Sequence, residues 1–137
     1  MQRCERGFTL IELISVVILI SVISVTLFSR LGSISGTNIQ ASRDDLIAAL
    51  FFAQQTAMAR PGIQAIVTSN SVSVTENGTP LVVHTKGYPL SFPSGINSTP
   101  ATFVYDKLGR TTAATITLTG SGGAITSVIV EASGYAH

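Results

Sequence analysis

The most constraining feature of this sequence is an apolar run from Phe8 to Phe28, which contains a single charged side chain, Glu12. At ~1.5 Å per residue, a helix of this length spans the ~30 Å hydrocarbon core of a bilayer. The run therefore predicts one transmembrane helix. An ionised carboxylate at the centre of a bilayer costs roughly 2.5–3.5 kcal/mol, and somewhat less near the interface, so Glu12 is a candidate functional residue that needs a partner.

The residues on either side of the run predict its orientation. Arg3 and Arg6 precede it, and positive residues stay in the cytoplasm, so residues after Leu31 are expected outside the cytoplasmic membrane. No A-x-A-like cleavage site follows the run, which is therefore expected to be retained. An ordinary signal anchor, with Glu12 near the positive end of its own helix dipole, is an alternative interpretation.

Composition argues against several classes of function. The net charge is +1 and only 11% of the residues are charged, so there is no basic stripe of the kind that binds nucleic acid. Cys4 is the only cysteine, which excludes a disulfide within the chain and a cysteine-based metal site. His84 and His137 are too few and too distant to predict a metal centre, and no G-x-S-x-G motif is present. We expect no enzyme, no metal and no cofactor.

The segment 31–60 predicts an amphipathic second half of the helix. Gly32 and Gly36 weaken the helix by about 1 kcal/mol each without necessarily ending it, and Ser42 with Asp45 resembles a capping box at which a helix restarts. An apolar stripe then recurs at helical spacing, and Pro61 ends the pattern. The stripe consists of Leu46, Leu50, Ala53 and Ala57, widened by Ile47, Phe51 and Met58. A continuous helix from Phe8 to Arg60 would be roughly 80 Å long.

Residues 61–137 predict an antiparallel β-domain. Asn77-Gly78 is a strong hairpin signal, and about seven strands occur at hairpin spacing. The expected strands are "IQAIVTS", "SVSVTE", "TPLVVHT", "YPLSF", "ATFVY", "AATITLTG" and "AITSVIVEA". The expected fold class is α+β, with one long N-terminal helix packed on an antiparallel sheet or sandwich. The aromatic residues Tyr88, Phe92, Phe103 and Tyr105 are expected in the core rather than in a ligand groove, and any ligand of the β-domain is unknown.

The stretch "RGFTLIEL", Arg6 to Leu13, resembles the leader junction of type IV prepilins and type II secretion pseudopilins. The resemblance implies that a prepilin peptidase cuts between Gly7 and Phe8 and methylates the new amine of Phe8. Glu12 then becomes the fifth mature residue. In a filament it is implied to meet the Phe8 amine of a neighbouring subunit, which makes it the assembly residue. The implied shape is the lollipop of pilins.

Later motifs narrow the resemblance. The stretches "FVYDKLGRT", "ITLTG" and "VIVEASGYAH" resemble H-type pseudopilins and FimT-like minor pilins. The helix ending "AQQTAMAR" and the terminal "GYAH" are similar to C-type minor pilins of mannose-sensitive haemagglutinin (MSHA) pili. The chain lacks a cysteine pair near its C-terminus and an arginine-rich ending, which counts against a major pilin and against a DNA-uptake pilin.

The resemblance implies a division into a prepilin leader (1–7), a transmembrane and assembly helix (8–30), an amphipathic second half of the helix (31–60) and a β-domain (61–137). It implies a single-pass inner-membrane protein with a periplasmic C-terminal domain, later part of a pilus or pseudopilus. Expected partners are other pilin subunits, the prepilin peptidase, the assembly machinery and the membrane, but not nucleic acid. The leading hypothesis is a minor pilin of an MSHA-type pilus, with a role in cell adhesion. The alternatives are an H-type pseudopilin of a type II secretion system and a membrane-anchored ligand-binding module.

Overall fold

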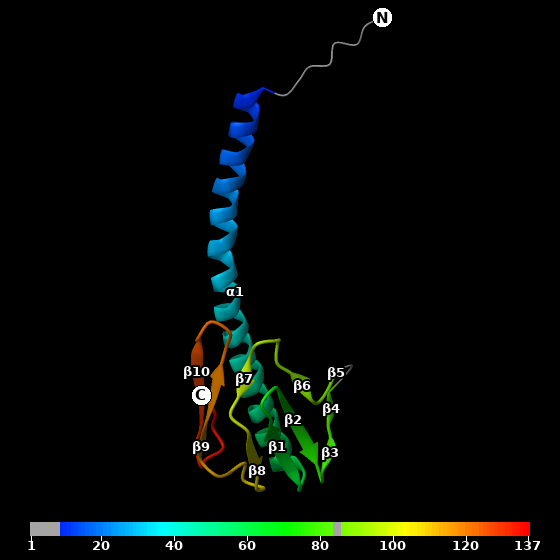
Figure 1. Ribbon diagram of the computed structural model, residues 1–137. Helices are drawn as coiled ribbons and strands as arrows, with labels where there is room; N and C mark the ends of the chain where they lie inside the picture. Colours follow the sequence, from blue (N-terminus) through cyan, green and yellow to red (C-terminus); the bar gives the residue numbers. More distant parts are fainter. Residues whose placement is uncertain (1–8, 84–85) are drawn as a thin grey trace, which may run out of the picture. The chain divides into compact units, whose positions relative to one another are not determined.

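The computed structural model describes residues 9–83 and 86–137, which form one helix and ten strands (Figure 1). The helix α1 comprises Leu10–Ala59. The strands are β1 (Ile63–Val67), β2 (Ser71–Glu76), β3 (Thr79–Pro80), β4 (Val82–Val83), β5 (Lys86–Gly87), β6 (Leu90–Ser91), β7 (Asn97–Ser98), β8 (Ala101–Val104), β9 (Ala114–Thr119) and β10 (Ile125–Val130). The chain divides into two compact units, residues 1–34 and 35–137.

Helix α1 begins just after Thr9, whose carbonyl accepts hydrogen bonds from the backbone N–H groups of Glu12 (3.0 Å) and Leu13 (3.3 Å). It continues through positions 32 and 36 without a break. The expected capping box at Ser42 is wrong, because this residue lies inside the helix. Its buried hydroxyl donates to the carbonyl of Asn38 (2.9 Å), so the serine is satisfied by the helix itself and caps nothing.

The larger sheet of the second unit has the order β3-β2-β1-β8, and β6 also pairs with β2. Strands β1 and β2 are antiparallel, with Ile63 opposite Glu76 and Val67 opposite Val72. Asn77 (φ 50°) and Gly78 (φ 85°) connect β2 to β3, and positive φ at both positions is what a two-residue type I′ turn requires. The predicted Asn77-Gly78 hairpin is confirmed.

A three-stranded sheet has the order β10-β9-β7, and β4 pairs with β5 in a two-stranded ribbon. The β9–β10 hairpin places Thr119 opposite Ile125. The outer edge of β10 is partly covered. Its Ile129 exchanges both backbone hydrogen bonds with His137 (2.8 and 3.0 Å), and its Ser127 carbonyl accepts a bond from the Arg43 guanidinium (3.3 Å).

The described chain has more strands than the seven expected because five of the ten contain only two residues. The predicted strand "TPLVVHT" is divided. Thr79–Pro80 pairs with β2, whereas Val82–Val83 pairs with β5, so the two pieces belong to different sheets.

One hydrophobic core lies between the second half of α1 and the sheets (Figure 1). The predicted stripe is confirmed at Leu46, Leu50, Ala53 and Ala57, which are all buried, but its predicted widening is wrong at Phe51 and Met58, whose side chains are 54% and 53% exposed. These two residues point away from the sheets, so the buried face is narrower than the apolar pattern. The alternate residues of the long strands face the buried stripe: Ile63, Ala65, Val67, Val72, Val74, Ile116, Leu118, Val128 and Val130. Phe92, Phe103 and Tyr105 are buried as expected, but Tyr88 is only partly buried. The α+β fold class is confirmed, with the helix packed on antiparallel sheets.

Candidate functional site

Glu12 is the third residue of α1 and lies in its first turn. The unpaired N–H groups at a helix N-terminus carry a partial positive charge, which favours a carboxylate in this turn. Among residues 9–83 and 86–137, no side chain forms an ion pair or hydrogen bond with the Glu12 carboxylate. The helix dipole is therefore its only stabilising feature in the described chain.

The hydroxyl groups in this part of α1 are satisfied within the helix. Those of Ser15, Ser21 and Ser24 each donate to the carbonyl four residues earlier at 2.7 Å, and Thr26 donates to the carbonyl of Ile23 at 2.8 Å. A hydroxyl bonded in this way adds no unsatisfied donor to an apolar environment. The helix surface from Leu10 to Leu27 is thus apolar in effect, with Glu12 as its exception.

The apolar side chains of this segment are exposed, from Leu10 at 76% to Val16 at 43%. A core helix of a soluble protein would bury such side chains, and an apolar surface of this extent is typical of a membrane or protein interface. The stretch Leu10–Leu27 of α1 is the one helical segment in the described chain that is long and apolar enough to cross a membrane. This arrangement is consistent with membrane anchoring.

Gly7 and Phe8, the two residues of the predicted cleavage junction, lie outside the described residues. The structure therefore places the carboxylate of the predicted site, Glu12, but not the amine that cleavage would create. His84, considered as a metal ligand, also lies outside the described residues. Among the residues that are described, no three His, Cys, Asp or Glu side chains gather in a way that would hold a metal ion.

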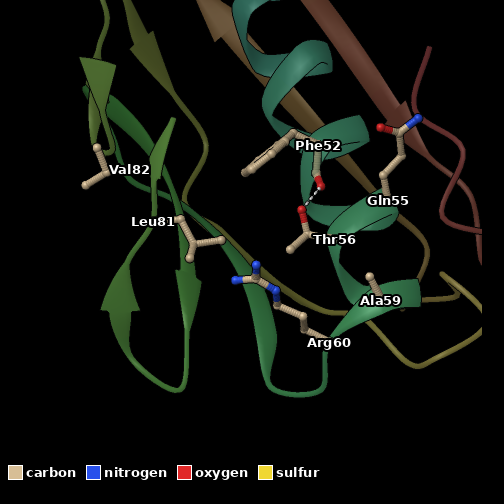
Figure 2. A pocket seen from close by; sticks show the side chains of 7 residues that line it. All are labelled: Phe52, Gln55, Thr56, Ala59, Arg60, Leu81 and Val82. Atoms are coloured by element: carbon tan, nitrogen blue, oxygen red, sulfur yellow. Dashed lines mark hydrogen bonds between the residues drawn. The ribbon is translucent and has the colours of Figure 1, made fainter. Parts of the chain in front are cut away.

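The second unit carries two surface hollows that sequence reasoning missed. Their volumes are about 500 and about 300 Å³, and Phe52 lines both. In the larger one, Phe52 of α1 and Arg60, the residue after the end of α1, extend toward the chain segment that holds Leu81 and Val82 (Figure 2). The smaller one lies between Asp45 on α1 and Tyr88. Both hollows therefore lie beside α1, the larger against Leu81 and Val82 and the smaller against Gly87, Tyr88 and Leu90.

Each hollow has one charged side chain in its described lining. Asp45 lines the smaller hollow, and its charge together with burial raises the pKa of the Tyr88 hydroxyl, burial being the larger cause. Arg60 lines the larger hollow, where its guanidinium lies 3.5 Å from the Glu76 carboxylate and is paired with it. The Phe52 and Tyr88 rings stack with centroids 6.0 Å apart.

Three sequence motifs that are distant along the chain meet at Gln54. Its side-chain amide donates to the carbonyl of Gly109 (3.2 Å), in the "DKLGR" turn, and to the carbonyl of Ser133 (3.0 Å), in "EASGY". Gly134 is buried and has φ 85°, and a side chain there would overlap the Gly109 carbonyl oxygen. The helix ending and both C-terminal motifs therefore form one packed junction, whose role is structural.

The "DKLGR" turn is held by Asp106. This carboxylate accepts the backbone N–H groups of Arg110 and Leu108 (both 2.8 Å) and the Arg110 guanidinium (2.9 Å). These contacts lower the pKa of Asp106, with the backbone hydrogen bond from Arg110 as the largest cause. Both oxygens of the carboxylate accept hydrogen bonds from residues of its own turn, so the role that the structure gives Asp106 is to hold this turn.

Comparison with known proteins bears on the N-terminal segment. Residues 2–28 match the family model described as the prokaryotic N-terminal methylation motif. No curated protein and no solved structure matches the chain. The motif implies processing by a prepilin peptidase and assembly with other pilins. It covers Gly7, Phe8 and Glu12 together with the apolar first half of α1. The chain therefore carries the N-terminal methylation motif of prepilins, which supports its placement in the type IV pilin and pseudopilin family.

Proposed function

We propose that this protein is a minor pilin-like subunit of an MSHA-type type IV pilus. A prepilin peptidase cuts between Gly7 and Phe8 and methylates the Phe8 amine, and the subunit then joins the filament through α1. The methylation motif over residues 2–28 supports processing. The resemblance of the C-terminal motifs supports a minor rather than a major pilin.

The observation that carries this proposal is the state of Glu12. It is the one carboxylate on the apolar surface of residues 10–27, and no described side chain neutralises it. Burying an unpaired charge costs several kcal/mol, whereas a buried pair of opposite charges offsets much of that cost. Glu12 is thus ready to receive a cation from another chain as helices pack. In the proposed filament, the Phe8 amine of a neighbouring subunit supplies this cation.

The proposal also includes a membrane topology. Residues 1–7 form the cytoplasmic leader, residues 8–30 cross the inner membrane, and residues 31–60 together with the β-domain (61–137) lie in the periplasm. The basic residues of the leader support this orientation through the positive-inside rule. The partners of the mature chain are other pilins and the inner-membrane assembly machinery.

Substitution of Glu12 tests the assembly step. Glu12→Val makes the segment more apolar, so membrane insertion and cleavage should continue, while incorporation should fall because the neighbour's amine loses its partner. Glu12→Asp keeps the charge on a shorter side chain and should be milder, and Glu12→Gln should resemble Val. Ser15→Val is the matched control, since it removes a hydroxyl that is already bonded within the helix.

The measurement is the fraction of processed subunit found in purified filaments, or crosslinked to other pilins if the subunit is scarce. Incorporation of Glu12→Val equal to that of the wild type and of Ser15→Val would contradict the assembly role. Intact mass of the membrane-extracted protein tests processing separately. In cells with an active prepilin peptidase, a chain that still carries Cys4 would refute cleavage after Gly7.

An H-type pseudopilin of a type II secretion system is the second candidate, favoured by the resemblance of "FVYDKLGRT" and "VIVEASGYAH". Loss of secretion without loss of pili in a deletion strain would assign the chain to that system. A membrane-anchored ligand-binding module is the third, favoured by the two hollows beside α1. In a passive anchor Glu12→Val would have no effect on function, which distinguishes it from both filament subunits.

A further inference from the structure

The smaller hollow of the second unit lies between α1 and the segment around Tyr88. Residues of both walls line it: Asp45, Ala48, Ala49, Phe52, Tyr88 and Leu90. The Tyr88 wall is attached to the larger sheet on both sides of the ring. The Tyr88 N–H donates to the carbonyl of Leu81 (3.0 Å), whose own N–H donates to the carbonyl of Val74 in β2 (2.9 Å). Leu90 pairs with Val72 of the same strand, so described residues fix this wall.

The charge in the described lining of this hollow is negative. Asp45 is exposed, and among the side chains that the structure describes none forms a hydrogen bond or ion pair with its carboxylate. Its charge reaches across the hollow, since it adds to burial, the larger cause, in raising the pKa of the Tyr88 hydroxyl. None of the described lining residues is basic. The hollow therefore favours a cation.

Two aromatic rings line the same hollow. Phe52 and Tyr88 stack with their centroids 6.0 Å apart and an angle of 23° between the ring planes. The face of an aromatic ring carries partial negative charge, and quaternary ammonium groups bind against such faces. The methyl groups of a quaternary ammonium are also compatible with an apolar lining, which Ala48, Ala49 and Leu90 supply here.

The small number of hydrogen-bond acceptors favours a methylated ammonium over a primary one. A primary ammonium has three N–H donors, and a donor that loses water without gaining a partner costs binding free energy. The side-chain acceptors in the described lining are the Asp45 carboxylate and the Tyr88 hydroxyl. A trimethylammonium group has no N–H to satisfy. The volume of about 300 Å³ is at the lower end of the range for small-molecule sites, so the ligand is small.

We infer that this hollow binds a small organic cation that carries a trimethylammonium group, as choline does, and no acidic group of its own. Asp45 supplies the opposite charge, and the rings of Phe52 and Tyr88 contact the methyl groups. A phosphate or carboxylate on the ligand would be repelled by Asp45 and would meet no basic side chain in the described lining. The inference goes beyond filament assembly and does not rest on it, since Glu12 lies in the other unit.

The probes are choline, its neutral isostere in which carbon replaces nitrogen, ethanolamine and phosphocholine. Each is titrated into the full-length protein in dodecyl maltoside, a detergent without a choline group, and binding is followed by saturation-transfer NMR. Choline should bind about 3- to 20-fold more tightly than the neutral isostere, because the isostere loses both the cation–π contact and the attraction to Asp45. Ethanolamine should bind more weakly than choline because it lacks the methyl groups, and phosphocholine because its phosphate is repelled.

Substitutions identify the groups that bind. Asp45→Asn keeps the shape of the side chain and should weaken choline binding about 2- to 5-fold while leaving the neutral isostere unaffected. Asp44→Asn is the matched control, because Asp44 is the exposed neighbour that does not line the hollow. Tyr88→Phe should retain choline binding and Tyr88→Leu should weaken it. Lys86, whose side chain lies outside the described ones, precedes the Tyr88 wall, and Lys86→Ala should bind choline like the wild type.

Four outcomes would overturn the inference. They are absence of choline binding, equal affinity for the neutral isostere, affinity for ethanolamine or phosphocholine as high as that for choline, and unchanged choline affinity in Asp45→Asn. Much tighter choline binding by Lys86→Ala would show that Asp45 already has a partner and would likewise refute it. Normal filament incorporation of Asp45→Asn is expected in every case, so failure of this inference is distinguishable from failure of the proposed assembly through Glu12.

Discussion

Gly134→Ala tests whether the junction around Gln54 stabilises the second unit. Gly134 has φ 85° and is buried, and a β-carbon there would overlap the Gly109 carbonyl oxygen and lie 2.7 Å from Nε2 of Gln54. Gly122 is the matched control. It has φ 86°, but a β-carbon there would meet nothing within 4 Å. The two positions share a backbone penalty and differ in their surroundings.

The structure gives a magnitude for each substitution. A left-handed backbone costs an alanine roughly 1–2 kcal/mol, which is the whole expected loss for Gly122→Ala. At Gly134, the "DKLGR" turn must also move, and this breaks the two hydrogen bonds of Gln54, to Gly109 and to Ser133. Each such bond contributes about 0.5–1.5 kcal/mol, so Gly134→Ala should lose about 1–3 kcal/mol more than Gly122→Ala.

Urea unfolding of the full chain in a mild detergent measures the difference. The chain has three tyrosines and no tryptophan, and Tyr88, Tyr105 and Tyr135 all lie within residues 35–137. The tyrosine band of the near-ultraviolet circular dichroism spectrum therefore reports on the second unit, because Phe8 and Phe28 of the membrane segment absorb at shorter wavelengths. Equal unfolding free energies for Gly134→Ala and Gly122→Ala would refute the reasoning, because they would show that the contacts around Gln54 can rearrange without loss of stability.

Two further predictions concern the core. Leu50 is 0% exposed and Phe51 is 54% exposed. Leu50→Asp should therefore cost about 3–5 kcal/mol and unfold the second unit, whereas Phe51→Asp should melt like the parent. Similar melting of both variants would show that the Leu50 face of the helix is not the buried one. Tyr105 has a buried hydroxyl without a hydrogen-bond partner in the described chain, so Tyr105→Phe should stabilise the protein by about 1 kcal/mol at neutral pH in the same urea assay. Burial raises the pKa of Tyr105 from 10.0 to about 12. Between these two pH values the tyrosine ionises in the unfolded chain but not in the folded one, so the free energy of unfolding should fall as pH rises from about 10 to about 12. An equally steep fall in Tyr105→Phe would contradict this assignment.

The features that the sequence predicted well depend on local chemistry or on a strong period. The Asn77-Gly78 turn follows from two residues that tolerate positive φ. The buried stripe of α1 follows from apolar residues at helical spacing, and the apolar run from Phe8 onward needs only length and composition. Each of these signals lies within a short window of sequence.

The features that the sequence missed depend on distant contacts. Ser42 has the chemistry of a cap, but α1 passes through it because neighbouring positions such as Leu46 are buried against the sheets, and packing outweighs the local preference. The two hollows bring residues of α1 beside Leu81, Val82 and Tyr88, and Gln54 reaches carbonyls 55 and 79 residues away. No spacing rule relates such positions, so only the folded chain shows that they meet.

The partly covered edge of β10 has a consequence for the proposed filament subunit. A bare strand edge is a template on which an identical chain can add a strand, and the product is an aggregate. Here His137 and the Arg43 guanidinium occupy hydrogen-bonding groups of Ile129 and Ser127 that a second chain would need. In the proposed filament, this covering disfavours pairing of neighbouring copies through β10, which leaves assembly to α1.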